Sequence, residues 1–140
     1  MAIKQTNIFP IDQEPRNAVG LAYPFSAFAT TGSVPFKLNY TTREQINSNL
    51  IIWFTTSQGE RPLNPNYGGG LKDILFDNLT TQTYDLVEKR IKDDLANYFP
   101  EVVLVDLEVL ENIDNNTLKV IMSYTVFNNS KDTLELNFNL

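Results

Sequence analysis

The spacing of apolar residues changes once along this chain, from a helical period to a strand period. Within residues 41–58 and 71–98 apolar residues recur every three or four positions, as on one face of an α-helix. From residue 103 to residue 140 they alternate with polar residues, as on one face of a β-strand. Helices followed by strands predict an α+β fold, here a two-layer domain of about three helices packed on a three-stranded antiparallel meander.

The helical part is predicted to contain three helices. The first begins near Thr41, where Thr-Thr-Arg-Glu has the form of a capping box. A short second helix follows three consecutive glycines, and the third is a long amphipathic helix that ends at Pro100. The predicted apolar faces are Ile46, Leu50, Trp53 and Phe54; Leu71, Ile74, Leu75 and Leu79; and Tyr84, Val87, Ile91, Leu95 and Tyr98.

The strand part is predicted to contain three strands joined by turns at residues 114–116 and 128–132. Their apolar faces are expected to be Val103, Val105, Leu107 and Val109; Leu118, Val120, Met122, Tyr124 and Val126; and Leu134, Leu136, Phe138 and Leu140.

The first 40 residues follow neither period. They contain four prolines, yet aromatic residues recur through them, which a disordered linker would lack. We therefore predict two regions, an extended N-terminal arm over 1–40 and a domain over 41–140. Two interpretations of the arm stay open: it packs on its own domain, or it becomes ordered against a neighbouring subunit.

The composition argues against most enzymes and against nucleic-acid binding. The 140 residues include no cysteine and no histidine, which removes disulfides, thiolate or imidazole metal sites and the Ser-His-Asp triad. The 17 acidic and 11 basic residues give a net charge of −6, which repels phosphate. No segment is apolar enough to serve as a signal peptide or to cross a bilayer, so we expect a protein that is made and kept in a cytoplasm, without a membrane partner.

The segment between the first two helices, residues 59–70, is predicted to be a loop of defined shape because it combines two prolines with four glycines. Its glycine run lacks the lysine and Ser/Thr spacing of a P-loop, so no nucleotide or other cofactor is predicted. Glu60, Asp73 and Asp77 surround the loop, and two such carboxylates could cleave a glycosidic bond. Because Arg61 would lower the pKa of Glu60 if the two pair, ordinary surface charges are the favoured interpretation.

The last strand would lie at one edge of the meander. An edge strand presents unpaired backbone groups and invites a partner strand. The polar residues that alternate along it could equally protect it, and the residues alone do not decide between these two interpretations.

Several of these segments together resemble a known family. The string Thr55-Thr56-x-x-Gly59-Glu60-Arg61-Pro62, then Asn64-Pro65-Asn66-Tyr67-Gly68, then Leu71-x-x-x-Leu75-Phe76-Asp77, followed by a long helix and a meander, is similar to the lysozyme-like baseplate wedge family of contractile-tailed bacteriophages. The family is shared with type VI secretion and contractile injection machines. The resemblance covers about residues 41–140.

The resemblance implies a structural virion protein of the tail baseplate, assembled in the host cytoplasm and present in multiple copies around a six-fold baseplate. It implies contacts with other wedge subunits, with the tail sheath, and with the central hub or tail tube. The wedge contact would involve the loop and the end of the long helix: Gly59, Glu60, Arg61, Pro62, Tyr67, Gly68, Tyr98, Pro100 and Glu101. The sheath contact would be a strand added along Thr133, Leu134, Glu135, Leu136, Asn137, Phe138 and Asn139, by which the protein would start the sheath.

One departure from the family pattern falls after the long helix. Many members have Glu-Pro-Arg there, whereas this chain has Phe99-Pro100-Glu101. Pro100 is kept, but the flanking acid and arginine are absent, so either the wedge contact is made differently, through Glu101 or Tyr98, or a neighbouring subunit compensates. Two alternatives accompany the structural prediction: a cell-wall glycosidase that acts through Glu60, and the same structural role in a secretion or injection machine.

Overall fold

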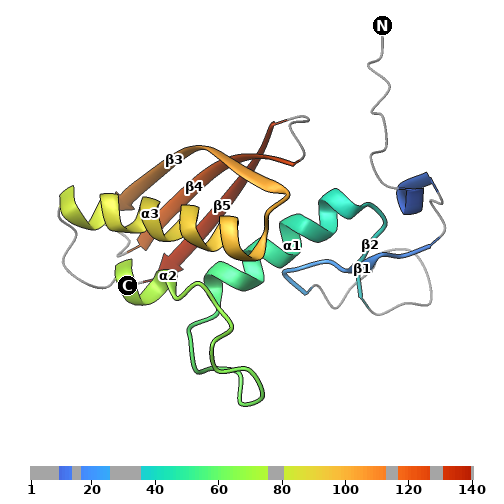
Figure 1. The fold of residues 1–140 in the computed structure, drawn as a ribbon, viewed down its shortest axis with the longest axis horizontal. Helices are drawn as coiled ribbons and strands as arrows, with labels where there is room; N and C mark the ends of the chain where they lie inside the picture. Colours follow the sequence, from blue (N-terminus) through green and yellow to red (C-terminus); the bar gives the residue numbers. More distant parts are fainter. Residues whose placement is uncertain are drawn as a thin grey trace, which may run out of the picture. The chain divides into compact units, whose positions relative to one another are not determined.

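The computed structural model describes residues 10–13, 17–25, 36–75, 81–112, 117–126 and 131–139 (Figure 1). The chain forms two compact units, Met1–Leu50 and Ile51–Leu140, and their boundary falls inside helix α1 (Thr42–Thr55). Phe76, Asp77, Leu79 and Leu140, and the predicted turn residues 114–116 and 128–130, lie outside the described residues.

The first unit holds a 3₁₀ turn, η1 (Pro10–Gln13), and a two-stranded antiparallel ribbon of β1 (Gly20–Leu21) and β2 (Leu38–Asn39). The buried Asn39 amide donates to Leu21 O at 3.2 Å and to Ser48 Oγ at 3.0 Å. Asp12 Oδ1 accepts hydrogen bonds from the backbone and the hydroxyl of Thr42, both at 2.8 Å. Side-chain hydrogen bonds therefore tie this short segment to the first turns of α1.

The start of α1 is the predicted capping box. The Thr41 hydroxyl accepts from Glu44 N at 3.2 Å, and the Glu44 carboxylate accepts in return from Thr41 N at 3.3 Å. These bonds satisfy backbone donors that the helix itself cannot pair. The predicted apolar stripe of this helix is confirmed, since its four members are at most 6% exposed.

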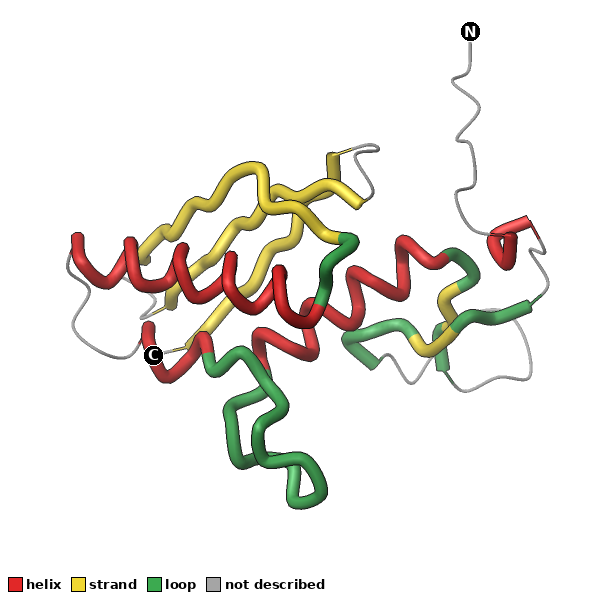
Figure 2. Tube along the Cα trace, in the orientation of Figure 1, coloured by secondary structure: helices red, strands yellow, loops and turns green. Residues whose placement is uncertain are grey.

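The second unit is built on a three-stranded sheet in the order β3 (Val102–Asn112), β4 (Thr117–Val126) and β5 (Lys131–Asn139), with antiparallel neighbours. Helix α3 (Thr81–Tyr98) crosses one face of this sheet, and the short α2 (Leu71–Leu75) packs against α3 (Figures 1 and 2). The predicted α+β fold with a meander is confirmed.

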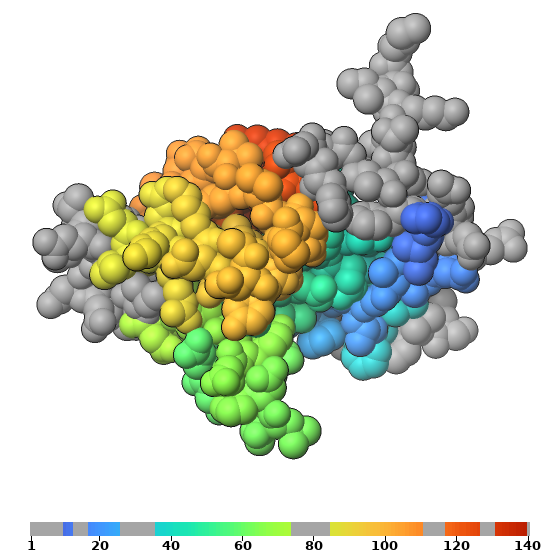
Figure 3. All heavy atoms as spheres, in the orientation of Figure 1, coloured from blue at the N-terminus to red at the C-terminus, as the bar shows by residue number. Residues whose placement is uncertain are grey.

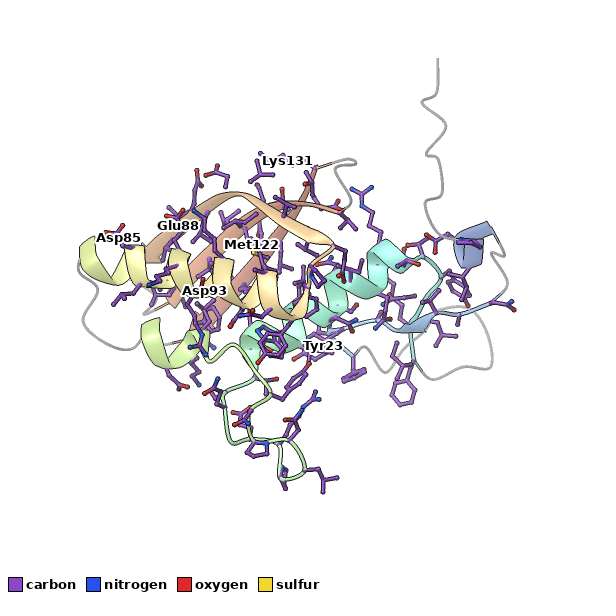
Figure 4. The ribbon with its side chains drawn as sticks, viewed as in Figure 1. Tyr23, Asp85, Glu88, Asp93, Met122 and Lys131 are labelled. Atoms are coloured by element: carbon purple, nitrogen blue, oxygen red, sulfur yellow. The ribbon has the colours of Figure 1, made fainter. Side chains whose placement is uncertain are left out.

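The core of this unit lies between α3 and the sheet. On β4 every second residue is buried, and Met122, in the middle of that strand, is 1% exposed, whereas Asp85 and Asp93 on α3 are exposed (Figure 4). The buried apolar residues among the described part of the second unit are Trp53, Phe54, Leu71, Val87, Ile91, Leu95, Val102, Leu118, Val120, Met122, Tyr124, Val126, Leu134, Leu136 and Phe138. No helix in the described ranges has the length and apolar character needed to cross a membrane.

The predicted apolar face of β3 is partly wrong. Leu104 pairs with Tyr124, and Asp106 pairs with Ser123, the next residue of β4. Val105 is therefore an extra residue on β3, which forms a β-bulge between Leu104 and Asp106. An extra residue exchanges the two faces for all residues beyond it. The residues that share the helix-covered face are therefore Val102 and Leu104 before the bulge and Leu107 and Val109 after it, while Val103 and Val105 are 50% and 53% exposed.

Candidate protein-interaction site

The loop that joins α1 to α2, residues 56–70, projects from the second unit (Figure 3). Backbone hydrogen bonds hold its far end closed: Gly59 N donates to Pro65 O at 2.8 Å, and Tyr67 N donates to Asn64 O at 3.1 Å. Glycines at 59, 68 and 70 have positive φ angles, which L side chains rarely adopt. The predicted loop of defined shape is thus confirmed.

The base of the loop is fixed to the end of α1. Gly69 N donates to Trp53 O at 2.8 Å, and Gly70 N donates to Thr56 O at 3.2 Å. A Cβ at Gly68 would lie 2.4 Å from Thr56 O, and one at Gly69 would lie 3.0 Å from Trp53 Nε1. The loop backbone passes directly against α1, which accounts for the glycines at positions 68 and 69.

Trp53 is the centre of an aromatic cluster that joins the loop to the end of α3. Its ring centroid lies 4.9 Å from that of Tyr67, 4.2 Å from that of Tyr98 and 5.9 Å from that of Phe99. Trp53 is 3% exposed, whereas Tyr98 is 53% exposed. The cluster therefore has a buried centre and a solvent-facing rim.

Arg61 extends this cluster outward. Its guanidinium carbon lies 3.6 Å from the centroid of the Tyr67 ring, a cation–π contact. The planar group keeps in-plane N–H donors that can serve a partner while one face rests on the ring. Glu60, beside it, instead accepts a hydrogen bond from Ser57 N at 3.2 Å.

A buried carboxylate holds the tryptophan in place. Asp94 Oδ2 accepts from Trp53 Nε1 at 3.1 Å, and Asp94 Oδ1 lies 3.4 Å from Arg90 Nε. Burial raises the pKa of Asp94 above its ordinary value of 3.8, against the opposing effects of the Trp53 hydrogen bond and of the Arg90 charge. The carboxylate thus links α3 to α1.

The structure brings together three of the predicted wedge-contact residues, Arg61, Tyr67 and Tyr98. Pro100 and Glu101 occupy the turn after α3, which Val102 N closes by donating to Phe99 O at 2.9 Å. Pro62 lies on the exposed far end of the loop. Sequence reasoning treated Trp53 only as a core residue and did not single out Asp94 or Phe99 for this cluster.

Strand β5 forms one edge of the sheet. It pairs with β4 alone among the described strands, and its burial alternates along its length. Thr133, Glu135, Asn137 and Asn139 are exposed, while Leu134, Leu136 and Phe138 are at most 6% exposed. Glu135 forms an ion pair with Lys119 of β4 at 2.8 Å. The outer face of β5 is thus polar and its buried face apolar, as predicted.

The carboxylates considered for glycosidase chemistry do not form an enclosed pair. Glu60 and Asp73 are both exposed, and Ser57 lies between them, donating its backbone N–H to Glu60 and its hydroxyl to Asp73 at 3.4 Å. A general acid of this kind needs a buried setting that raises its pKa. Within the part of the chain that the structure describes, no group of three or more His, Cys, Asp or Glu could hold a metal ion.

Comparisons with known proteins agree on one family. The family model described as baseplate wedge protein gp25 matches residues 41–131, from the N-cap of α1 to the first residue of β5. The chain is 34% identical over 95 residues to the baseplate wedge protein gp25 of Enterobacteria phage T4, an alignment that covers 68% of this chain and 72% of the phage protein.

Two solved structures have the same fold. A Geobacter sulfurreducens protein assigned as a tail lysozyme matches with a TM-score of 0.62 and 25% identity, over 80% of this chain and 96% of its own. A chain of the anti-feeding prophage baseplate matches with a TM-score of 0.61 and 25% identity, over 77% of this chain and 84% of its own.

Proposed function

This chain belongs to the gp25 family of baseplate wedge proteins, and from this premise we propose that it is an inner wedge subunit that starts the tail sheath. Its structural role in a virion tail baseplate follows from membership of the family. In our proposal it binds neighbouring wedge subunits through the cluster around Trp53, and it offers β5 to the first ring of sheath subunits.

The composition of the cluster supports the wedge contact. Tryptophan, tyrosine and arginine are the residues most enriched where a few side chains dominate the binding energy of an interface. Here Arg61 and Tyr98 lie at an exposed rim around a buried Trp53, and their positions are already fixed by ring contacts. Pre-ordered side chains lose little entropy on binding. In this chain the rim, Pro100 and Glu101 together make the contact for which many members of the family use Glu-Pro-Arg.

The observation that carries the sheath contact is that β5 pairs with β4 alone among the described strands. Its nine residues then present a row of backbone donors and acceptors along the other side. Backbone pairing transmits force along a sheet without requiring particular side chains. A polar outer face also keeps such an edge from aggregating before the sheath arrives.

Three positions in register across the sheet give a test. Leu110, Lys119 and Asn137 pair side by side on β3, β4 and β5, and all three lie on the sheet face opposite the buried residues. A benzophenone amino acid would replace each in turn in phage particles, and cross-links would be identified by mass spectrometry. Since neighbouring strands are about 4.8 Å apart, an added sheath strand lies one spacing from β5 but two from β4.

We expect sheath cross-links to be strongest from position 137 and weakest from position 110. Equal cross-linking from all three positions would mean that the sheath docks on the face of the sheet, and strongest cross-linking from 110 would mean that it uses β3. Either result overturns the proposed strand addition. The absence of any baseplate cross-link would overturn the wedge role.

We further propose that the protein has no catalytic activity, although one structural relative is assigned as a tail lysozyme. The exposed position of Glu60 supports this proposal. Purified wild-type protein and Glu60→Gln would be compared on peptidoglycan. Lysis by the wild type that Glu60→Gln abolishes would contradict the proposal.

A further inference from the structure

One apolar side chain of the second unit takes no part in the fold. Leu63, at the far end of the loop, is 101% exposed, so folding buries none of the surface that it would expose in an extended chain. The other ten large apolar side chains that are exposed among the described residues are only 43–59% exposed. An exposed leucine alone is ordinary. What distinguishes Leu63 is the rigidity of its support.

The backbone that carries Leu63 is constrained on both sides. Pro62 and Pro65 restrict φ, and Asn64 N donates to Arg61 O at 3.1 Å across the tip. The bond from Gly59 N to Pro65 O closes the segment at 2.8 Å. A leucine held in this way binds a partner with little loss of backbone entropy, unlike one in a flexible loop.

The charges next to the tip are engaged at its base. Glu60 accepts from Ser57 N, and Arg61 lies over the Tyr67 ring. The outermost residues, 62–66, carry no charged side chain, although the whole chain has a net charge of −6. One leucine among prolines and asparagines is too small an apolar surface to hold a membrane, but inserting it into an apolar pocket of a protein would remove its whole side chain from water.

We propose that Leu63 is the anchor of the wedge contact and inserts into an apolar pocket on a neighbouring baseplate subunit. The pocket is of leucine size, and its rim carries carboxylates that face the Arg61 guanidinium. This inference rests on the proposed wedge role and adds to it the residue that anchors the contact and the chemistry of the partner surface.

The test measures binding to the cognate wedge complex, purified from cells infected with a phage mutant that does not make this subunit. Leu63→Ala should weaken binding about thirtyfold or more, as for a central interface residue, and Leu63→Met should bind within a few-fold of the wild type. The matched control is Leu86→Ala on α3, a leucine that is 59% exposed in the same unit. It should bind like the wild type.

Thermal unfolding should show equal midpoints for the wild type and Leu63→Ala, because the side chain makes no packing contact. If Leu63→Ala binds as tightly as the wild type, or if Leu63→Ala and Leu86→Ala lose the same affinity, Leu63 is not the anchor, but the wedge role still stands. Failure of the wild type itself to bind would instead refute the wedge role. Self-association of the isolated protein that depends on Leu63, seen by sedimentation, would also overturn the inference, since the pocket would then lie on a second copy.

Discussion

Two glycines of the loop provide a matched pair for testing how its shape is determined. Gly59 and Gly68 both have positive φ angles, +90° and +116°, so alanine is strained at either position. They differ in the space around them. A Cβ at Gly59 meets nothing within 4 Å, whereas a Cβ at Gly68 would lie 2.4 Å from Thr56 O, a backbone atom that cannot rotate away.

The expected losses of stability follow from this difference. Gly59→Ala carries only the backbone strain, about 1–2 kcal/mol. Gly68→Ala adds to that strain a clash that must be relieved by moving the loop or α1, about 1–3 kcal/mol more, for a total of about 2–5 kcal/mol. Gly59→Asn should be close to the wild type because asparagine tolerates positive φ.

Urea denaturation followed by circular dichroism would measure these differences. Gly68→Ala should also weaken binding to the wedge complex, because it displaces the neighbouring Tyr67 and hence the platform for Arg61. Equal destabilisation by alanine at 59 and at 68 would refute the reasoning, since it would mean that the close approach to Thr56 plays no part.

Three further predictions concern pairs in the second unit. In Trp53→Phe the buried Asp94 loses its indole donor, which should lower stability by about 1–3 kcal/mol in urea denaturation; an unchanged midpoint would contradict the role of that bond. Because the pKa of Asp94 is raised, the folded state binds its proton more tightly than the unfolded state. The wild type should therefore lose stability relative to Asp94→Asn as the pH rises from about 3.8 through the raised pKa, and a difference that is constant with pH would disprove this. Glu135→Gln should change stability by less than about 1 kcal/mol, because the pair with Lys119 is solvent-exposed. It should also leave sheath assembly intact, because the proposed sheath contact is made by the backbone; loss of sheath in this variant would argue against such a contact.

The three strands of the sheet show how far the alternation of apolar and polar residues predicts which face of a strand is buried. On β4 and β5 the alternation of apolar and polar residues predicted the buried faces correctly, because a strand without irregularities keeps its period. On β3 the same alternation runs unbroken through Val103, Val105 and Leu107, yet the bulge at Val105 exchanges the faces. The bulge depends on how β3 pairs with β4, which the spacing within β3 does not contain.

The interaction site divides in the same way. Loop shape was predictable, because prolines and glycines act on their own backbone and the immediate neighbours. The grouping of Arg61, Tyr67 and Tyr98 around Trp53 was not, since these side chains come from three different segments.

The sequence by itself determined the three α-helices, the three strands of the meander, the capped start of α1 and the family. All of these depend on interactions between residues a few positions apart, or on a string of residues that can be matched directly. Only the tertiary structure decided the bulge, the buried Asp94 beside the tryptophan and the full exposure of Leu63. Each of these depends on which distant segments pack together, and packing is a property of the folded chain and not of any local period.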